Sequence, residues 1–369
     1  MRARIIVFLI IIQSILLFAH WFIYTTGKAF LAVTDPPGLT PVEIAVALLS
    51  VSFVAASLLA YRFSNPIVRG FYRIAALWLG AVNFFFLAAC LCWVLYFVAA
   101  LGRLDPNWPR WAGIVFMAAL LATVYGVINA RWIRTRKVTI ALPNLPEAWR
   151  GRIAAVVSDV HLGHVNGPRF LARIVARVQH LNPHVVFMTG DLYDGTAIQA
   201  ASAAAPLQNL KPPLGTFFVT GNHEEFRDPT RYLDAVRSTG VRVLENERVS
   251  IDGLQVVGVP DHASFNPSRF RTILNRLLVD RSRPSILLSH TPRALSIPEE
   301  AGISLQLSGH THGGQVFPFT WFTHKIFRAF TKGLHRHGQM QVYTTTGAGT
   351  WGPPLRVGTI PEIVLIEFA

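Results

Sequence analysis

The first third of the chain alternates four long, uncharged apolar stretches with short polar connections. The stretches are residues 5–24, 44–61, 74–101 and 111–130. Each has the roughly 18–20 or more apolar residues that an α-helix needs to cross the hydrocarbon core of a bilayer. Aromatic side chains that favour the membrane–water interface stand near their ends, at Trp21, Tyr24, Tyr61, Trp108, Trp111 and Trp132. The pattern predicts an all-α transmembrane region of four helices over residues 1–137.

The first stretch could be mistaken for the apolar core of a secretory signal, because Arg2 and Arg4 precede it. It is longer than such a core, no small-residue cleavage site follows it, and three further stretches come after it. We therefore expect it to remain in the protein as a membrane helix.

Lysine and arginine are distributed unevenly over the connections between the stretches. Nine lie on one side of the four-helix weave, at Arg2, Arg4, Arg62, Arg69, Arg73, Arg131, Arg134, Arg136 and Lys137. Three lie on the other side, at Lys28, Arg103 and Arg110. Positively charged flanks stay in the cytoplasm, so both termini and everything after residue 137 are predicted to be cytoplasmic.

The stretches contain no Asp, Glu, Lys or Arg, which argues against an ion or proton carrier. Isolated polar residues do occur within them, at Gln13, His20 and Asn83. These side chains are expected to form hydrogen bonds between helices.

Charge follows the same division of the chain. Residues 1–137 hold 12 Lys/Arg against 3 acidic residues (+9), and residues 138–369 hold 22 against 17 (+5), which sum to the net charge of +14. The densest basic cluster adjoins the apolar stretches, so anionic lipid headgroups are a more economical partner than nucleic acid. We therefore expect a lipid bilayer as partner and no nucleic acid. The two cysteines, Cys90 and Cys92, lie inside an apolar stretch and fit neither a disulfide framework nor a zinc site.

Residues 138–369 show a different pattern, in which short apolar runs end in polar loops. Val138–Pro146 has the look of a lead-in strand or linker, and apolar residues from Phe170 to Val178 recur at helical spacing. The apolar runs are 153–157, 185–188, 216–220, 286–288 and 305–307. Continuous runs of this kind are typical of strands in a sheet that is covered on both faces. The pattern predicts an α/β domain.

Each of these five runs is followed by Asp, Asn or His. The residues are Asp159 and His161, Asp191 and Asp194, Asn222 and His223, His290, and His310 and His312. Residues two apart at a strand end point the same way, as two ligands of one ion would. Carboxylate, amide and imidazole groups without a thiolate favour divalent manganese, iron or zinc. Their number exceeds what one ion needs.

These residues carry a family resemblance. Asp159-x-His161, Gly190-Asp191-x-x-Asp194, Gly221-Asn222-His223, His290 and Gly309-His310-x-His312 resemble the five motifs of the calcineurin-like metallophosphoesterases, in the family's order. The resemblance covers roughly residues 150–369. The runs 309–315 and 347–354 are similar to a small bacterial branch with YkuE-type and YaeI-type members, which is similar to UDP-2,3-diacylglucosamine pyrophosphatases. The four-helix region lies outside the resemblance.

The resemblance implies a four-layer αββα sandwich over residues 138–369, with two divalent metal ions at the strand ends. The first metal site would be Asp159, His161, Asp191 and His312. The second would be Asp191, Asn222, His290 and His310. Manganese is the first expectation, with iron or zinc as alternatives. A shared carboxylate such as Asp191 can hold two cations roughly 3.5–4 Å apart.

The resemblance also implies a catalytic role for His223, which would assist the leaving oxygen and would be oriented by the carboxylate of Asp194. Neighbours on an extended chain point oppositely, so His223 cannot easily be a ligand if Asn222 is one. His164, close to the first motif, is either a packed residue or a substrate contact.

We therefore expect an integral membrane phosphoesterase, in a bacterial inner membrane, whose catalytic domain faces the cytoplasm. Its substrate would be a lipid-linked phosphodiester or pyrophosphate, such as a UDP-diacylglucosamine-type intermediate. One alternative is a broad-specificity phosphodiesterase that acts on a soluble or nucleotide substrate. Another is a catalytically silent membrane sensor, although the complete ligand set with His223 and Asp194 counts against it.

One basic, aromatic-rich segment, residues 317–330, has two interpretations. It contains six aromatic residues, with His324, Lys325 and Arg328 between them. It could be a loop on the substrate side of the domain, packed on the domain itself. It could also be an interfacial segment, with aromatic rings in the bilayer and cations at the headgroups.

Overall fold

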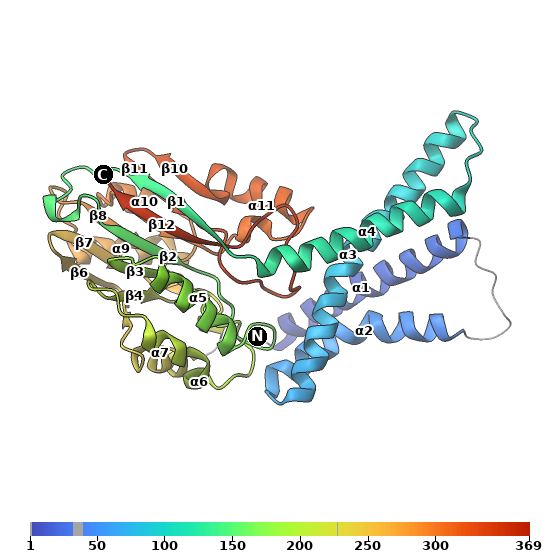
Figure 1. The fold of residues 1–369 in the computed structure, drawn as a ribbon, viewed down its shortest axis with the longest axis horizontal. Coiled ribbons are helices and arrows are strands. Elements are labelled where there is room, and N and C mark those ends of the chain that lie inside the picture. Colours follow the sequence, from blue (N-terminus) through green and yellow to red (C-terminus); the bar gives the residue numbers. More distant parts are fainter. Residues whose placement is uncertain (1, 32–39, 227) are drawn as a thin grey trace. The chain divides into compact units, whose positions relative to one another are not determined.

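The chain forms two compact units in the computed structural model, which describes residues 2–31, 40–226 and 228–369 (Figure 1). The first unit comprises Met1–Ile128 with the short segment Gly352–Leu355. The second comprises Asn129–Trp351 and Arg356–Ala369.

The first unit contains four helices that are long and apolar enough to cross a membrane. They are α1 (Arg2–Leu31), α2 (Pro41–Arg62), α3 (Pro66–Leu101) and α4 (Trp108–Arg131). Each extends beyond the stretch predicted for it. Capping explains two of the starts, because Thr40 and Glu43 form a capping box at α2 and Asn65 caps α3.

Polar residues inside these helices link them to one another, as predicted. Gln13 Nε2 donates to the backbone oxygen of Ser50 at 3.0 Å, which joins α1 to α2. Trp78 Nε1 donates to His20 Nε2 at 2.8 Å, which joins α3 to α1. The prediction of interhelical hydrogen bonds is confirmed for Gln13 and His20.

The second unit contains two six-stranded sheets (Figure 1). In spatial order, the first sheet is β1 (Arg134–Ile140), β12 (Glu362–Phe368), β2 (Ile153–Val157), β3 (Val185–Thr189), β4 (Thr216–Val219) and β5 (Arg242–Val243). The second is β10 (Gly333–His337), β11 (Met340–Thr344), β9 (Leu305–Ser308), β8 (Ser285–Leu288), β7 (Leu254–Gly258) and β6 (Glu247–Ile251). Strands β2, β3 and β4 are parallel, and so are β7, β8 and β9.

Strand β1 begins before the predicted domain boundary at residue 138. It pairs in parallel with β12, and Arg134 lies opposite Glu362. Arg134, Arg136 and Lys137 are therefore residues of an edge strand as well as basic residues after the last membrane helix. Their charges do not indicate a strand, because a basic cluster directly after an apolar stretch is also typical of the flank of a membrane helix.

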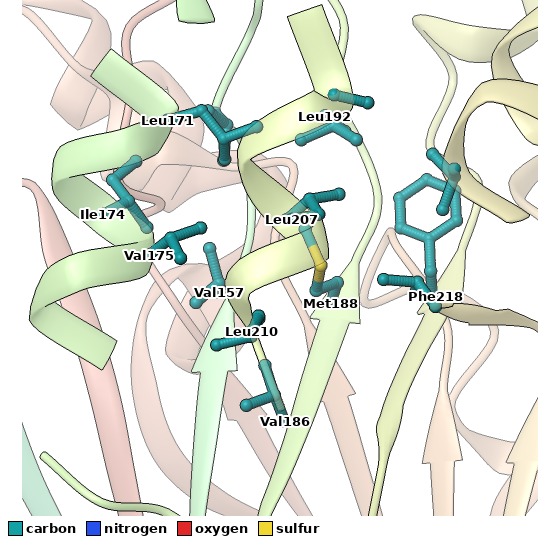
Figure 2. Packing of buried hydrophobic residues seen from close by; sticks show 14 of the residues in the cluster. Val157, Leu171, Ile174, Val175, Val186, Met188, Leu192, Leu207, Leu210 and Phe218 are labelled. Atoms are coloured by element: carbon teal, nitrogen blue, oxygen red, sulfur yellow. The ribbon is translucent and has the colours of Figure 1, made fainter. Parts of the chain in front are cut away.

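Alternating residues of the strands enter different cores. Ala154 and Val156 face a core between the two sheets, to which strands of both sheets contribute. Ala155 and Val157 face the opposite way, toward a core shared with the helices α5 (Pro168–His180), α6 (Ala200–Ala204) and α7 (Thr230–Arg237). In Figure 2, Leu171, Ile174 and Val175 of α5 point toward Val157 and its neighbouring strand.

A third core covers the outer face of the second sheet. Its helices are α8 (Asp261–Phe265), α9 (Pro267–Leu277) and α10 (Ser296–Glu300). The order of layers is helices, sheet, sheet, helices. The predicted four-layer αββα sandwich, preceded by four apolar helices, is confirmed.

Candidate metal centre

The carboxyl ends of five strands, three in the first sheet and two in the second, carry the predicted ligands. Asp159 and His161 follow β2, Asp191 follows β3, Asn222 follows β4, His290 follows β8, and His310 and His312 follow β9. Asn222 and His310 are half-buried and the other five are buried. The carboxyl ends of parallel strands meet at one edge of a sheet, so the fold brings together side chains up to 153 positions apart, from Asp159 to His312.

The first group contains Asp159, His161 and His312, whose ligand atoms all lie within 4.8 Å of one another. The Nε2 atoms of His161 and His312 are 3.0 Å apart, and His312 Nε2 is 3.5 Å from Asp159 Oδ1. Ligands at right angles and about 2.1 Å from one ion would be about 3.0 Å apart. Burial holds the pKa of both imidazoles well below its usual range, so both rings are neutral and can offer a lone pair.

The second group contains Asp191, His290 and His310, again with ligand atoms within 4.8 Å of one another. Asp191 Oδ2 is 3.1 Å from His290 Nε2, and Asn222 Oδ1 is 2.9 Å from His310 Nδ1. The same Asp191 oxygen lies 3.8 Å from His161 Nε2 in the first group. Asp191 is therefore within reach of both groups.

His290 shows that the centre fits a cation. Its Nδ1 lies 2.6 Å from the backbone oxygen of Thr189 and donates to it, so the Nε2 lone pair faces Asp191. That Nε2 atom is buried without a hydrogen-bond partner among the described residues. Burial lowers the pKa of His290, but the Asp191 carboxylate outweighs burial and raises it well above the usual range. A lone pair and a carboxylate that face each other require a proton or a cation, and a divalent metal ion would replace the proton.

The backbone at the ligands is strained. Asp159, His161, Asp191, His310 and His312 all have positive φ, between 49° and 69°. Few residues other than glycine adopt this left-handed conformation, and such strain concentrates at functional sites. Gly309 has a related role, because a Cβ atom there would overlap the side chains of Ser158 and Asp159.

His223 is buried beside the two groups and forms a third group with His161 and Asp191, whose ligand atoms also lie within 4.8 Å of one another. Its Nε2 lies 4.0 Å from Asp191 Oδ2, the longest of the three imidazole separations from that oxygen. Its Nδ1 is 3.0 Å from the backbone oxygen of Asp194 and its backbone N–H donates to Asp191 Oδ1 at 2.9 Å. Because the backbone oxygen of Asp194 can only accept, Nδ1 carries a proton and donates it to this oxygen. This hydrogen bond orients the ring so that Nε2 faces the ligand groups.

The contact between Asp194 and His223 differs from the predicted one. The backbone carbonyl of Asp194 contacts the ring, whereas the carboxylate accepts hydrogen bonds from the backbone and side chain of Thr196, at 2.8 and 2.5 Å. Gly163 packs directly against the carboxylate, and a Cβ at Gly163 would overlap it. His164, whose Nδ1 lies 3.0 Å from Thr196 Oγ1, is almost completely buried.

Two exposed aromatic rings flank His223. Phe226 and Trp351 have ring centroids 4.5 and 5.6 Å from that of the histidine, and they are 60% and 56% exposed. Gln315 holds Trp351 in place through two hydrogen bonds of 3.0 Å to its backbone. A substrate group that leaves toward His223 would therefore meet an aromatic surface.

Sequence reasoning assigned no role to Glu224. Its carboxylate is completely buried and accepts hydrogen bonds from the backbone N–H groups of Asp191, Tyr193 and Gly221, at 2.9, 2.8 and 2.7 Å. Burial and the Asp191 charge raise the pKa of Glu224 to about 8. Glu224 thus ties the loop after β3 to the loop after β4. The sequence signal was its position directly after Asn222 and His223.

Arg356 was also missed. Its guanidinium is completely buried, donates to the backbone oxygens of Thr346 and Gly349 at 2.7 and 2.6 Å, and lies 3.2 Å from His312 Nδ1. Burial lowers the pKa of Arg356 to about 10, which still leaves it charged near neutral pH. The guanidinium therefore fixes the loop behind the first ligand group.

Comparison with known proteins agrees with this geometry. The sequence pattern of the calcineurin-like phosphoesterases matches residues 154–314. The chain is 30% identical over 320 residues to an uncharacterized metallophosphoesterase of Campylobacter jejuni, covering 84% of each chain. It is 35% identical over 271 residues to a transmembrane protein with metallophosphoesterase domain of Danio rerio, covering 68% of this chain and 61% of that protein. It is 31% identical over 249 residues to the metallophosphoesterase YkuE of Bacillus subtilis, covering 64% of this chain and 86% of the relative.

Proposed function

Since the chain belongs to the calcineurin-like metallophosphoesterase family and is a metal-dependent phosphoesterase, we propose that it hydrolyses a phosphodiester or pyrophosphate bond of a lipid-linked substrate. A UDP-diacylglucosamine-type intermediate has the required chemistry. One observation carries the proposal: only Trp132 and Ile133 separate α4, which is apolar enough to cross a membrane, from the first strand of the catalytic sheet. A freely soluble substrate would not require the catalytic domain to be attached to a membrane.

We propose that the catalytic domain faces the cytoplasm, in the inner membrane of a bacterium. The support is the distribution of Lys and Arg, nine on the side that contains both termini and three on the other. A lipid intermediate that is made and consumed at the cytoplasmic leaflet would then be within reach of the domain.

The proposed metal ligands are Asp159, His161, Asp191 and His312 for one ion, and Asp191, Asn222, His290 and His310 for the other. Manganese is proposed, with iron and zinc as alternatives. When bound, two such ions lower the pKa of a water and offset the negative charge that develops on the phosphoryl oxygens. Five of these seven ligands are buried and two are half-buried, which limits the access of bulk water to them.

His223 is proposed to protonate the leaving oxygen. Its protonated ring would keep the Nδ1 proton on the backbone oxygen of Asp194 and would deliver the proton of Nε2. The main-chain carbonyl fixes the orientation of the ring without adding a negative charge. Phe226 and Trp351 would hold the leaving group beside it.

The test is a substrate comparison with the full-length protein in lipid nanodiscs and added Mn²⁺. It should hydrolyse a lipid-linked UDP-diacylglucosamine more efficiently than the same headgroup with short, soluble chains, and Asp191→Asn should abolish both activities. Higher kcat/KM for soluble nucleotides would favour the broad phosphodiesterase instead. The exposed rings of Phe226 and Trp351, which could stack against a base, are the specific support for that alternative. Metal binding without turnover of any substrate would indicate the silent sensor.

A further inference from the structure

We propose that α11 (Phe319–Phe327) is a membrane-docking helix that inserts its aromatic face into an anionic phospholipid leaflet. The helix, orange in Figure 1, follows the loop that carries His310 and His312. This inference concerns where the catalytic domain sits on lipid. It does not depend on which substrate is hydrolysed.

The orientation of α11 is the opposite of that expected for a helix on a soluble domain. No side chain of its nine residues is buried. Thr320 and Thr323 are half-buried on the side toward the domain, where Thr320 packs closely on Gly314. Four of its large apolar side chains point outward, and their exposed fractions are 54% for Phe319, 51% for Trp321, 48% for Phe322 and 73% for Ile326.

The outward residues form one surface. Phe319, Phe322 and Ile326 are three and four positions apart, so they share a face of the helix. The Trp321 ring lies 5.0 Å from that of Phe322, and Lys325 Nζ stands 3.6 Å from the Trp321 centroid. Helices that lie in the membrane interface combine large aromatic residues on one face with lysine or arginine at its border.

The charge around α11 suits an anionic surface. Exposed cations follow along the chain at Lys325, Arg328, Lys332 and Arg336. The sequence contains no Asp or Glu from residue 301 to residue 361, so no acidic residue of this segment offsets them. Basic residues beside a membrane are attracted to the negative surface potential of anionic lipid. A protein partner with an apolar groove would not require so many cations.

The docking helix is connected to the metal centre. The Phe327 ring lies 6.0 Å from the ring of His310, and Thr311 Oγ1 donates to the backbone oxygen of Thr331 at 2.7 Å. The loop with two proposed ligands therefore packs on the C-terminal end of the helix and on the turn that follows it. A leaflet that holds α11 would present headgroup phosphates near this loop.

The experiment measures the depth of α11 in the bilayer with the full-length chain. Cys90 and Cys92 are replaced by alanine, and a single cysteine is introduced by Phe322→Cys or Ile326→Cys. Each is labelled with an environment-sensitive fluorophore in nanodiscs of phosphatidylcholine and phosphatidylglycerol. Both labels should show blue-shifted emission and should lose intensity when the lipid carries a spin label on its chains.

Phe265→Cys is the matched control, because Phe265 is an exposed phenylalanine of the same unit, 71% accessible, on α8. Its label should stay in water and should not be quenched. Equal quenching at 265 and 322, no quenching at 322, or a blue shift at 322 that needs a second protein copy rather than lipid would each overturn the proposal.

A second measurement covers the case in which a labelled variant does not fold. Phe319→Ser, Phe322→Ser and Ile326→Ser are combined in one chain, since these exposed residues contribute little to the core. Turnover of a soluble aryl phosphodiester should remain that of the parent, which reports an intact fold. The quenching of Trp321 fluorescence by brominated lipid should be lost, after correction for the other tryptophans. The reason is that the removal of each large apolar side chain lowers the partition of the helix from water into lipid by about tenfold or more. Unchanged quenching would refute docking through this face, even if no lipid-linked substrate is ever found.

Discussion

Replacing Glu224 by glutamine tests how the loops of the metal centre are held together. The carboxylate accepts three backbone N–H groups, and glutamine can accept with only one of its two terminal atoms. With its oxygen toward Asp191 and Gly221, glutamine keeps two hydrogen bonds and turns an N–H group against the N–H of Tyr193. Burial and the Asp191 charge raise the pKa of Glu224 to about 8 in the metal-free protein, and cations on Asp191 would favour the ionised acceptor.

The expected cost follows from the number of donors left without an acceptor. One buried N–H without a partner costs about 1–3 kcal/mol, so Glu224→Gln should lose that much stability. Glu224→Ala would leave three such donors and a cavity, which approaches the 5–15 kcal/mol total of a typical domain. Glutamine is therefore the informative change. A residue that orients metal ligands typically changes metal affinity or activity by about 10–100-fold.

The assay is Mn²⁺ activation of aryl phosphodiester turnover by the full-length protein in nanodiscs. The concentration for half-activation should rise about 10–100-fold in Glu224→Gln, and saturating Mn²⁺ should restore much of kcat. The control is Glu225→Gln, the next residue, whose carboxylate accepts from Thr220 Oγ1 and the backbone N–H of His262 and not from the backbone of Asp191, Tyr193 or Gly221. That variant should lose thermal stability without a shift in Mn²⁺ activation. An identical Mn²⁺ dependence in Glu224→Gln and the parent would refute the positioning role.

Further predictions concern the ligands, the acid and the topology. Asp191→Asn should lose both metal ions and Asp159→Asn mainly one, as metal analysis would show; two tightly held ions in Asp191→Asn would exclude the bridging role. His223→Ala should keep both metals and lose roughly 10²–10⁴-fold in turnover of alkyl phosphodiesters but far less with aryl ones, and equal losses would exclude the acid role. Burial raises the pKa of Asp194 to about 6, so between about pH 4 and 6 its carboxyl group is protonated in the folded state and ionised in the unfolded state. The free energy of unfolding therefore falls by up to about 3 kcal/mol as the pH rises over that range. In metal-free protein, the melting temperature of Asp194→Asn should therefore rise relative to the parent as pH increases from 4 to 7. A cytoplasm-dependent reporter fused after Ala369 should be active, and activity of a periplasm-dependent reporter at that position would reverse the orientation.

The sequence predicted the chemistry of the centre better than its geometry. Apolar runs that end in Asp, Asn or His are visible without coordinates, and parallel strands bring such ends together whatever the details of packing. The left-handed backbone at Asp159 and Asp191 is invisible in the sequence, because aspartate adopts this conformation at a minority of its positions and the sequence does not show which. The same limit explains Asp194, since no pattern shows whether its carbonyl or its carboxylate meets His223.

The first strand of the catalytic sheet begins at Arg134, before the lead-in strand or linker predicted from Val138, and its charges give the reason. In β1, charged residues alternate poorly with apolar ones, and three of the first four residues are basic. An edge strand tolerates charge on its exposed side, and natural sheets use lysine there to prevent pairing with other chains. A cluster of cations after an apolar helix satisfies both the positive-inside rule and edge-strand protection, so the sequence alone could not separate the two causes.

The least predictable part of the centre is its support behind His312, where the contacts span most of the chain. Asn129, near the end of α4, donates to the backbone oxygens of Arg356 and Thr359 at 2.9 and 2.8 Å, across 227 and 230 positions. Its own oxygen accepts from Arg134 at 2.6 Å, where β1 begins. The Arg356 side chain then lies against His312. A buried asparagine at the end of an apolar helix has no local pattern that reveals a partner so far away. Asn129, near the end of the last apolar helix, is thus hydrogen-bonded to the backbone of Arg356, whose side chain lies against the proposed ligand His312.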